Sequence, residues 1–277
     1  MPIRFAICNE LFKDWPLEKV LTYCAGIGYE GVEVAPFTLA KDIRGLPARQ
    51  VAEWRAASEK AHIPIIGLHW LLASPDGLSI NGPRHAARET TREFMFALIR
   101  LCRDLGGRIM VFGSPKQRSV EAGDTYEAVW QRSVAMFRAC GEEAQRQGIV
   151  IALEPLTQKE TNFLLTKDEA VRLIQEVKCP AVRLHLDTKA MLGSEKKPPE
   201  AIIRESKDYL AHFHANDVNL RGPGMGDVDF RPIARALRDI QYDGYVSVEV
   251  FDFTPGPEAT ATRSLEYLRK VFSEQPG

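Results

Sequence analysis

The chain has 277 residues, of which 45% are hydrophobic and 26% charged, a composition that excludes a disordered chain. Its 36 Lys and Arg residues balance 37 Asp and Glu residues, so the charge does not support a nucleic-acid groove. No apolar run approaches the ~18 residues that cross a bilayer, and the N-terminal MPIRFAICNE lacks a basic segment followed by an apolar core. We therefore expect neither a membrane span nor a secretory signal.

Apolar runs rich in Val and Ile alternate along the chain with amphipathic stretches. The runs predict strands, in chain order, over residues 3–9, 31–35, 64–70, 108–113, 150–155, 182–187, 211–215 and 245–251. The 3.6-residue periodicity between them predicts helices, among them residues 17–25, 88–105, 126–146, 167–177 and 232–240. Two of these helices begin with a capping pair, Asp124 with Glu127 and Thr166 with Glu169.

This alternation favours one α/β domain over residues 1–277. Strands that alternate with helices indicate a parallel sheet, and eight such units in one chain fit a closed (β/α)8 barrel, the TIM barrel, of about 250 residues. An open doubly wound sheet would usually show a glycine-rich turn after its first strand. Here the residues after Ile7 are Cys-Asn-Glu-Leu-Phe, without glycine.

The cysteines indicate a reducing compartment. Their number, five, is odd, and no CxxC pair occurs, unlike a disulfide framework or a zinc–thiolate site. Four of them lie in apolar periodic segments, which is typical of buried reduced thiols. We expect a cytoplasmic protein.

The last four predicted strands each end in a polar residue that a packed core would not select: Glu154, Asp187, His214 and Glu249. Each follows the previous one by about one βα repeat of roughly 30 residues, so the four side chains should meet at the barrel mouth. Three carboxylates brought together repel one another unless a cation compensates. Oxygen ligands with one imidazole suit Mn²⁺ best, with Mg²⁺ and Co²⁺ as alternatives, and zinc is not excluded.

The motifs around these residues, LEP, LDT, HFHAND and VEVF, resemble those of the xylose-isomerase-like barrel superfamily. The branch that they resemble most is the ketose 3-epimerases of the tagatose/psicose type. The resemblance implies that all four residues bind the metal and that Glu154 and Glu249 act as acid and base. It also implies that Glu160 contacts the substrate.

Two positions differ from the pattern of that branch. It often carries His three residues after the metal Asp, where this chain has Ala190. It also carries Arg six residues after the metal His, where this chain has Leu220, with Arg221 one place later. Because the resemblance implies that both positions hold substrate hydroxyls, we expect Arg221 to contact the substrate. Lys189 is a further difference and can contact a carboxylate or an oxyanion, or point outward from a loop.

Other polar and aromatic residues lie at or near predicted strand ends. His69 and Trp70 follow the third strand and are candidates to wall the substrate pocket, whereas Phe112, Phe37 and Trp15 are candidates for an apolar sugar platform. His185 and His212 each lie two residues before a proposed ligand, one layer deeper in the barrel. They can support a ligating carboxylate or pack as core histidines.

The chemistry that follows is proton abstraction from a ketose through a metal-stabilised enediolate, with the second glutamate returning a proton to the opposite face. The expected partner is a small sugar or keto-sugar, and a homodimer or homotetramer is compatible with the sequence. A metal-dependent lyase of the inosose dehydratase or 3-keto C-glycoside deglycosidase type stays open, because it begins with the same step. A related abasic-site endonuclease would need more histidines than the six present, and a barrel that only binds sugar would have no need of both glutamates.

Overall fold

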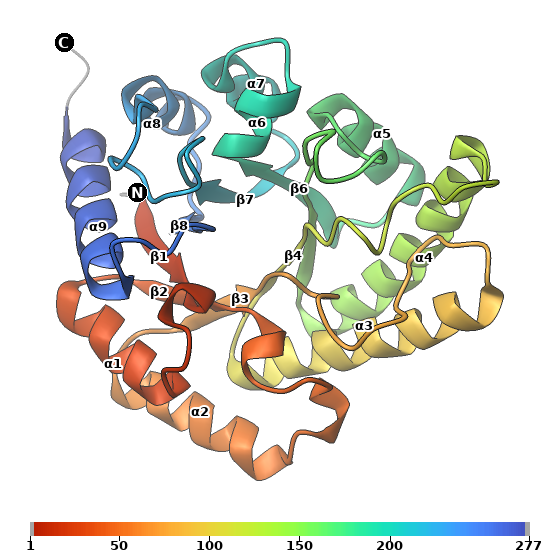
Figure 1. The fold of residues 1–277 in the computed structure, drawn as a ribbon, viewed down its shortest axis with the longest axis horizontal. Helices are drawn as coiled ribbons and strands as arrows, with labels where there is room; N and C mark the ends of the chain where they lie inside the picture. The colour runs from red at the N-terminus through yellow and green to blue at the C-terminus, as the bar shows by residue number, and fades with distance from the viewer. Residues whose placement is uncertain (1–2, 275–277) are drawn as a thin grey trace.

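The computed structural model describes residues 3–274 and forms a closed barrel of eight parallel strands (Figure 1). The strands are β1 (Arg4–Cys8), β2 (Gly31–Val34), β3 (Ile65–Leu68), β4 (Ile109–Phe112), β5 (Val150–Leu153), β6 (Val182–Asp187), β7 (Leu210–Ala215) and β8 (Tyr245–Val248). Each strand pairs with the next along the chain, and β8 pairs with β1. The predicted (β/α)8 barrel is confirmed.

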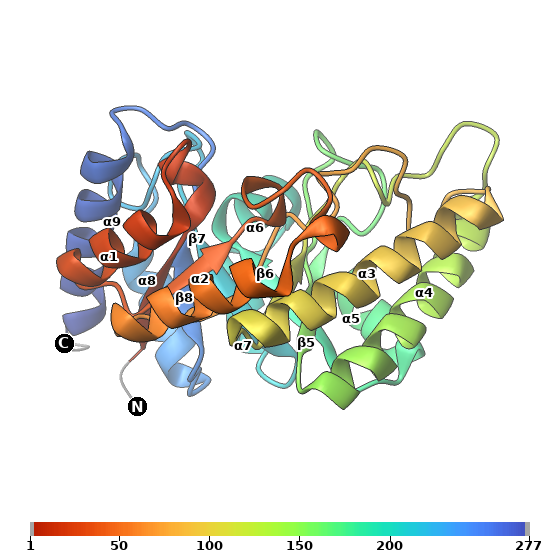
Figure 2. The same cartoon turned by 90° about the horizontal axis from the view of Figure 1, so that it is seen from below.

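Helices surround the barrel and return the chain to the start of each next strand. The α-helices are α1 (Leu17–Ile27), α2 (Ala48–Lys60), α3 (His85–Leu105), α4 (Tyr126–Gln147), α5 (Lys167–Val177), α6 (Thr188–Ser194), α7 (Pro199–Glu205), α8 (Phe230–Asp239) and α9 (Pro257–Ser273). Short 3-10 helices η1 (Asn9–Phe12), η2 (Pro36–Thr38) and η3 (Ile43–Gly45) follow β1 and β2. In Figure 2, η1 and the loops after the carboxyl ends of the strands lie along the upper edge. Within residues 3–274, no helix is both long enough and apolar enough to cross a membrane.

One of the two predicted caps is one residue out of place. Thr166 caps α5 as expected, because its hydroxyl accepts the N–H of Glu169 at 3.3 Å. Helix α4, however, is capped by Thr125 rather than Asp124: the Thr125 hydroxyl accepts the Ala128 N–H at 3.2 Å. The carboxylate of Asp124 instead accepts the N–H of Thr125 and pairs with Arg132, so it is not available to the helix.

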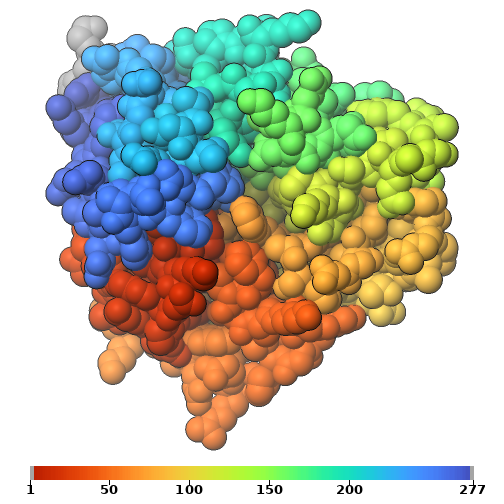
Figure 3. All heavy atoms as spheres, in the orientation of Figure 1, coloured from red at the N-terminus to blue at the C-terminus, as the bar shows by residue number. Residues whose placement is uncertain are grey.

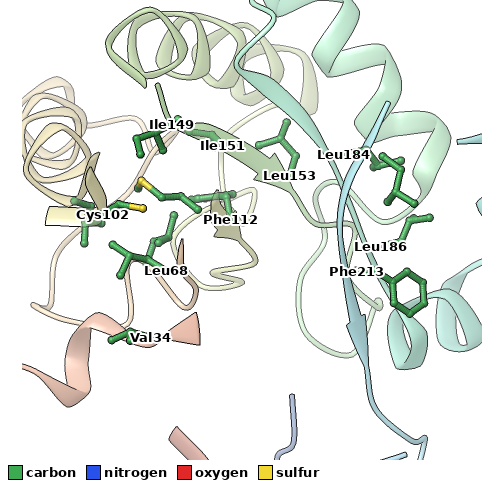
Figure 4. Close-up of a cluster of buried hydrophobic side chains, with 14 of the residues drawn as sticks. Val34, Leu68, Cys102, Phe112, Ile149, Ile151, Leu153, Leu184, Leu186 and Phe213 are labelled. Carbon is green, nitrogen blue, oxygen red and sulfur yellow. The ribbon is translucent and has the colours of Figure 1, made fainter. Parts of the chain in front are cut away.

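Apolar side chains fill the space between the barrel and the helices (Figure 4). Phe112 belongs to this core, contrary to its predicted place beside a substrate: it is fully buried, and its ring centroid lies 5.0 Å from that of Phe137 on α4. Because successive strand residues point to opposite faces, Phe112 faces the helices while Gly113 after it opens onto the barrel mouth. All five cysteines are buried and unpaired.

Candidate active site at the barrel mouth

The four predicted polar residues converge at the carboxyl ends of the last four strands. Asp187 ends β6 and His214 lies within β7, while Glu154 and Glu249 come directly after β5 and β8. One ligand atom from each lies within 4.8 Å of the others, and all four side chains are buried. The spacing of one residue per repeat thus produces a compact cluster of three carboxylates and an imidazole.

The carboxylates of this cluster repel one another, and burial adds to the cost of their charge. Burial, together with the neighbouring carboxylates Glu249 and Asp187, raises the pKa of Glu154 well above its usual range. Burial also raises the pKa of Asp187 to about 6. For Glu249 burial acts in the same direction, but His214 and His69 outweigh it and lower the pKa. A divalent cation would offset the repulsion, and a set of oxygen donors with one imidazole fits Mn²⁺, Mg²⁺ or Co²⁺.

Beneath the cluster, Glu33 of β2 connects two histidines. Its Oε2 lies 3.2 Å from Nε2 of His214 and 2.8 Å from Nε2 of His212. The other ring nitrogen of His214, Nδ1, therefore faces the cluster, 3.2 Å from Oε2 of Glu249. His212 is buried one layer deeper than His214, as the strand alternation predicted, but it contacts Glu33 rather than a carboxylate of the cluster. His185 packs its ring 4.2 Å from that of His214, and burial lowers its pKa, which keeps it neutral.

His69 and Trp70 hold the carboxylate of Glu249 from the other side. The Nδ1 atom of His69 and the indole N–H of Trp70 lie 3.2 and 3.1 Å from Oε1 of Glu249. The Nε2 atom of His69 lies 2.9 Å from Glu10 Oε2. His69 is fully buried between these two carboxylates and does not line the pocket, whereas Trp70 does.

A cavity of about 370 Å³, which we call the central cavity, adjoins the cluster. Its wall includes Glu154, Glu249, Glu160 and Lys189. Lys189 points inward: its Nζ donates to Oε1 of Glu160 at 2.8 Å and lies 4.3 Å above the ring of Phe251. Of the two alternatives for Lys189, the prediction that it points outward from a loop is wrong.

Arg221 does not reach the central cavity, contrary to its expected role beside the substrate. Its Nε donates to Oδ2 of Asp252 at 2.9 Å, and a second guanidinium nitrogen donates to Thr254. The ion pair holds the side chain against the loop after β8, with about 42% of it exposed.

Several residues of the site escaped sequence reasoning. Gly113 leaves space for the carboxylate of Glu154, which a Cβ at this position would overlap. Arg118, fully buried, donates from Nη1 to the backbone carbonyl of Glu154 at 2.6 Å. Glu33 did carry a signal, because it is the one charged residue in the apolar strand GVEV.

The chain resembles known proteins both in sequence and in fold. Residues 21–271 match the family model described as xylose isomerase-like TIM barrel. The D-psicose 3-epimerase of Ruminiclostridium cellulolyticum is 34% identical over 44% of this chain and 41% of that enzyme, so the alignment spans less than half of its length. The fructoselysine 3-epimerase of Escherichia coli O157:H7 is 24% identical over 94% of each chain. A crystal structure of D-psicose 3-epimerase in the presence of D-fructose superposes with a TM-score of 0.86, at 21% identity over 98% of this chain and all of that one.

Proposed function

This chain belongs to the xylose isomerase-like TIM barrel family, and on that premise we propose that it is a metal-dependent epimerase of keto-sugars, an isomerase that inverts a carbon next to a carbonyl. One observation carries the proposal. Glu154 and Glu249 reach a single cavity from β5 and β8, with Asp187 and His214 beside them. The relatives named above are sugar 3-epimerases, which supports the same chemistry.

We assign the metal to Glu154, Asp187, His214 and Glu249, with Mn²⁺ as the expected ion and Mg²⁺ or Co²⁺ as alternatives. When bound there, such a cation would polarise the carbonyl of the sugar and offset the negative charge that develops as the neighbouring carbon loses its proton. The donors come from four strands of one closed barrel, so the fold holds them in place without the ion.

Glu154 and Glu249 carry the proton. One carboxylate takes the proton from the carbon, and the other returns a proton to the opposite face of the same carbon, which inverts it. The two exchange roles for the two epimers, as reversibility requires. His69 and Trp70 fix the carboxylate of Glu249 through Oε1. Arg118 fixes the backbone of Glu154.

Glu160 and Lys189 are proposed to orient the sugar. Their ion pair lies at the wall of the central cavity and offers both an acceptor and a donor to substrate hydroxyls. Trp70 and Phe251 add an apolar part to the wall, with the Phe251 ring beneath Lys189, and shield the reacting carbon from water.

Proton NMR in D₂O tests the proposal. Mn²⁺-loaded enzyme is incubated with D-fructose, D-tagatose, D-psicose and a set of 3-keto-glycosides. Deuterium should enter the carbon next to the carbonyl, and the epimer should appear. Loss of an aglycone without an epimer would instead establish a lyase, and no exchange with any keto-sugar would refute the proposal.

The variant Glu249→Gln checks the assignment of the proton carriers. It should lower the rate of deuterium exchange about 100-fold or more, while Glu127→Gln, on the exposed surface of α4, should exchange at the wild-type rate. Circular dichroism should show both variants folded. An exchange rate of Glu249→Gln near that of the wild type would remove Glu249 from the mechanism.

A further inference from the structure

A second cavity lies beside the central one. It has a volume of about 910 Å³ and is lined by residues that follow β1, β2, β3 and β8, together with two residues of α2. We call it the aromatic cavity. Both volumes fall in the range of about 300–1,000 Å³ that is typical of small-molecule sites. Figure 3 shows the first segments of the chain, in red, lying against late segments, in dark blue, on this face.

Trp70 and Phe251 line both cavities and form the wall between them. Their ring centroids lie 6.0 Å apart, and the rings are inclined by 27°. Trp70 is 38% exposed, and its indole N–H donates to Glu249 at 3.1 Å. Because the two cavities share these residues, a group attached to a sugar in the central cavity can extend past Trp70 and Phe251 into the aromatic cavity.

Seven aromatic side chains line the second cavity. Besides the two wall residues, its lining includes Phe12, Trp15, Phe37, Trp54 and Phe253. Phe253 is 38% exposed, and Trp15 and Phe37 are only partly buried. Exposed aromatic faces gathered in a concave site gain free energy when a planar apolar group covers them.

Two uncharged polar side chains of the lining, Asn9 and Thr38, offer little to the hydroxyls of a second sugar. The amide of Asn9 donates to the hydroxyl of Thr38 at 2.9 Å and accepts the N–H of Ala35 at 2.7 Å. The hydroxyl of Thr38 donates to the carbonyl of Ala35 at 2.7 Å. These two side chains are thus already engaged, whereas the hydroxyls of a sugar would need partners.

The charges argue against a phosphate. The charged residues of the lining are three acids, Glu10, Asp14 and Glu18, and one base, Lys13. This balance repels an anionic group. An uncharged, planar group is the occupant that fits both the aromatic lining and the engaged polar groups.

We propose that the substrate is a keto-sugar that carries an uncharged aromatic substituent, and that the aromatic cavity binds this substituent while the sugar reacts in the central cavity. The inference rests on the proposed function for the identity of the sugar, but the binding of the substituent can be measured without turnover.

Two matched pairs of uncharged compounds test it: methyl and phenyl 3-dehydro-β-D-glucopyranoside, and 1-O-methyl- and 1-O-benzyl-D-fructose. Within a pair the sugar is the same and only the substituent differs. For at least one pair, the aromatic member should have a kcat/KM for deuterium exchange about tenfold or more above that of its methyl partner, since it buries additional apolar surface. Calorimetry should show the same preference in Kd.

Phe253→Ala should remove most of this preference, because it deletes an exposed part of the aromatic lining. Tyr126→Ala is the matched control: Tyr126 is 39% exposed, close to the 38% of Phe253, but lies on α4 outside the lining. Its ratio of aromatic to methyl kcat/KM should equal that of the wild type. The ratio within one variant does not depend on how much of the protein is folded.

The outcomes separate the two proposals. Equal kcat/KM and Kd for both members of each pair, or a preference that survives Phe253→Ala, would overturn the aromatic cavity as a substrate site and leave the epimerase function standing. If no keto-sugar exchanges its proton but the aromatic compounds still bind more tightly and lose this advantage in Phe253→Ala, the cavity is supported and the epimerase function fails. If none of the four compounds binds, the aromatic cavity fails as a substrate site, and proton exchange with the free ketohexoses alone decides the epimerase function.

Discussion

Glu33 and His214 are separated by 181 positions in the sequence, yet the orientation of the His214 imidazole depends on their contact. By holding Nε2, Glu33 directs Nδ1 toward the proposed metal. Carboxylates that hold the second nitrogen of a ligating histidine commonly fix its tautomer and its ring orientation. Glu33 itself is fully buried and also contacts His212.

Glu33→Gln should therefore weaken Mn²⁺ binding by about 10–100-fold, measured by isothermal titration calorimetry. The control Glu30→Gln removes a glutamate just before β2 that contacts only the backbone of Phe5 among the described hydrogen bonds. It should keep the wild-type Kd. Equal metal affinity of Glu33→Gln and wild type would show that Glu33 has no influence on His214.

Gly113 matters because of its closeness to Glu154. A Cβ at this position would overlap the carboxylate, which is the flexible end of a side chain and can move. Gly113→Ala should thus leave the protein folded but displace Glu154, and kcat/KM should fall roughly 100-fold. Gly26→Ala, at a helical position where a Cβ meets nothing within 4 Å, should leave kcat/KM unchanged. Wild-type activity in Gly113→Ala would mean that Glu154 tolerates the shift.

At the scale of elements, the pairing of β3 with β4 depends on a close approach of backbones. Gly67 lies opposite Ile109 in this pair, and a Cβ at Gly67 would overlap the backbone carbonyl oxygen of Ile109. Unlike a side-chain end, this carbonyl cannot move without breaking the register of the two strands. The glycine in the short apolar run IIGL is therefore a requirement of barrel closure.

Gly67→Ala should lower the free energy of unfolding by about 1–3 kcal/mol, the usual cost of an overpacked interior. Urea denaturation followed by circular dichroism measures it. In the same assay Gly26→Ala should be neutral or stabilising, because alanine favours helix α1 by up to about 1 kcal/mol. An unchanged urea midpoint for Gly67→Ala would show that β3 and β4 can move apart without loss of stability.

At the scale of the whole molecule, barrel closure opposes the repulsion of three buried carboxylates. Because a cation that binds only the folded state stabilises it by mass action, Mn²⁺ at 100 times its Kd should add about 2.7 kcal/mol to the free energy of unfolding. Differential scanning calorimetry should show a higher Tm with MnCl₂, reversed by EDTA.

The same experiment has two controls. His214→Ala lacks one proposed ligand and should show a much smaller increase in Tm, whereas Asp104→Asn, on the exposed surface of α3, should behave as the wild type. A Tm of the wild type that does not respond to Mn²⁺, Mg²⁺ or Co²⁺ would contradict the metal site.

The sequence by itself determined the eight βα units and the four residues that converge at the mouth. Both depend on local period: two residues in a strand, and about 30 in a repeat, which fixes the height of Glu154, Asp187, His214 and Glu249. The sequence could place a residue at the end of a strand, but it could not always predict the direction in which the side chain points. Phe112 lies in the core because successive side chains at the end of β4 point to opposite faces, and that of Phe112 points toward the helices.

Only the tertiary structure decided the contacts between distant strands. That Glu33 holds His214, that Lys189 turns inward to Glu160 and that Arg221 pairs with Asp252 all depend on which strands and loops become neighbours when the barrel closes. The aromatic cavity is a further example, since its lining comes from both ends of the chain. Such contacts have no period in the sequence. Glu33 of β2 and His214 of β7 come together only because β8 pairs with β1, and the other two pairs join the loops of neighbouring strands.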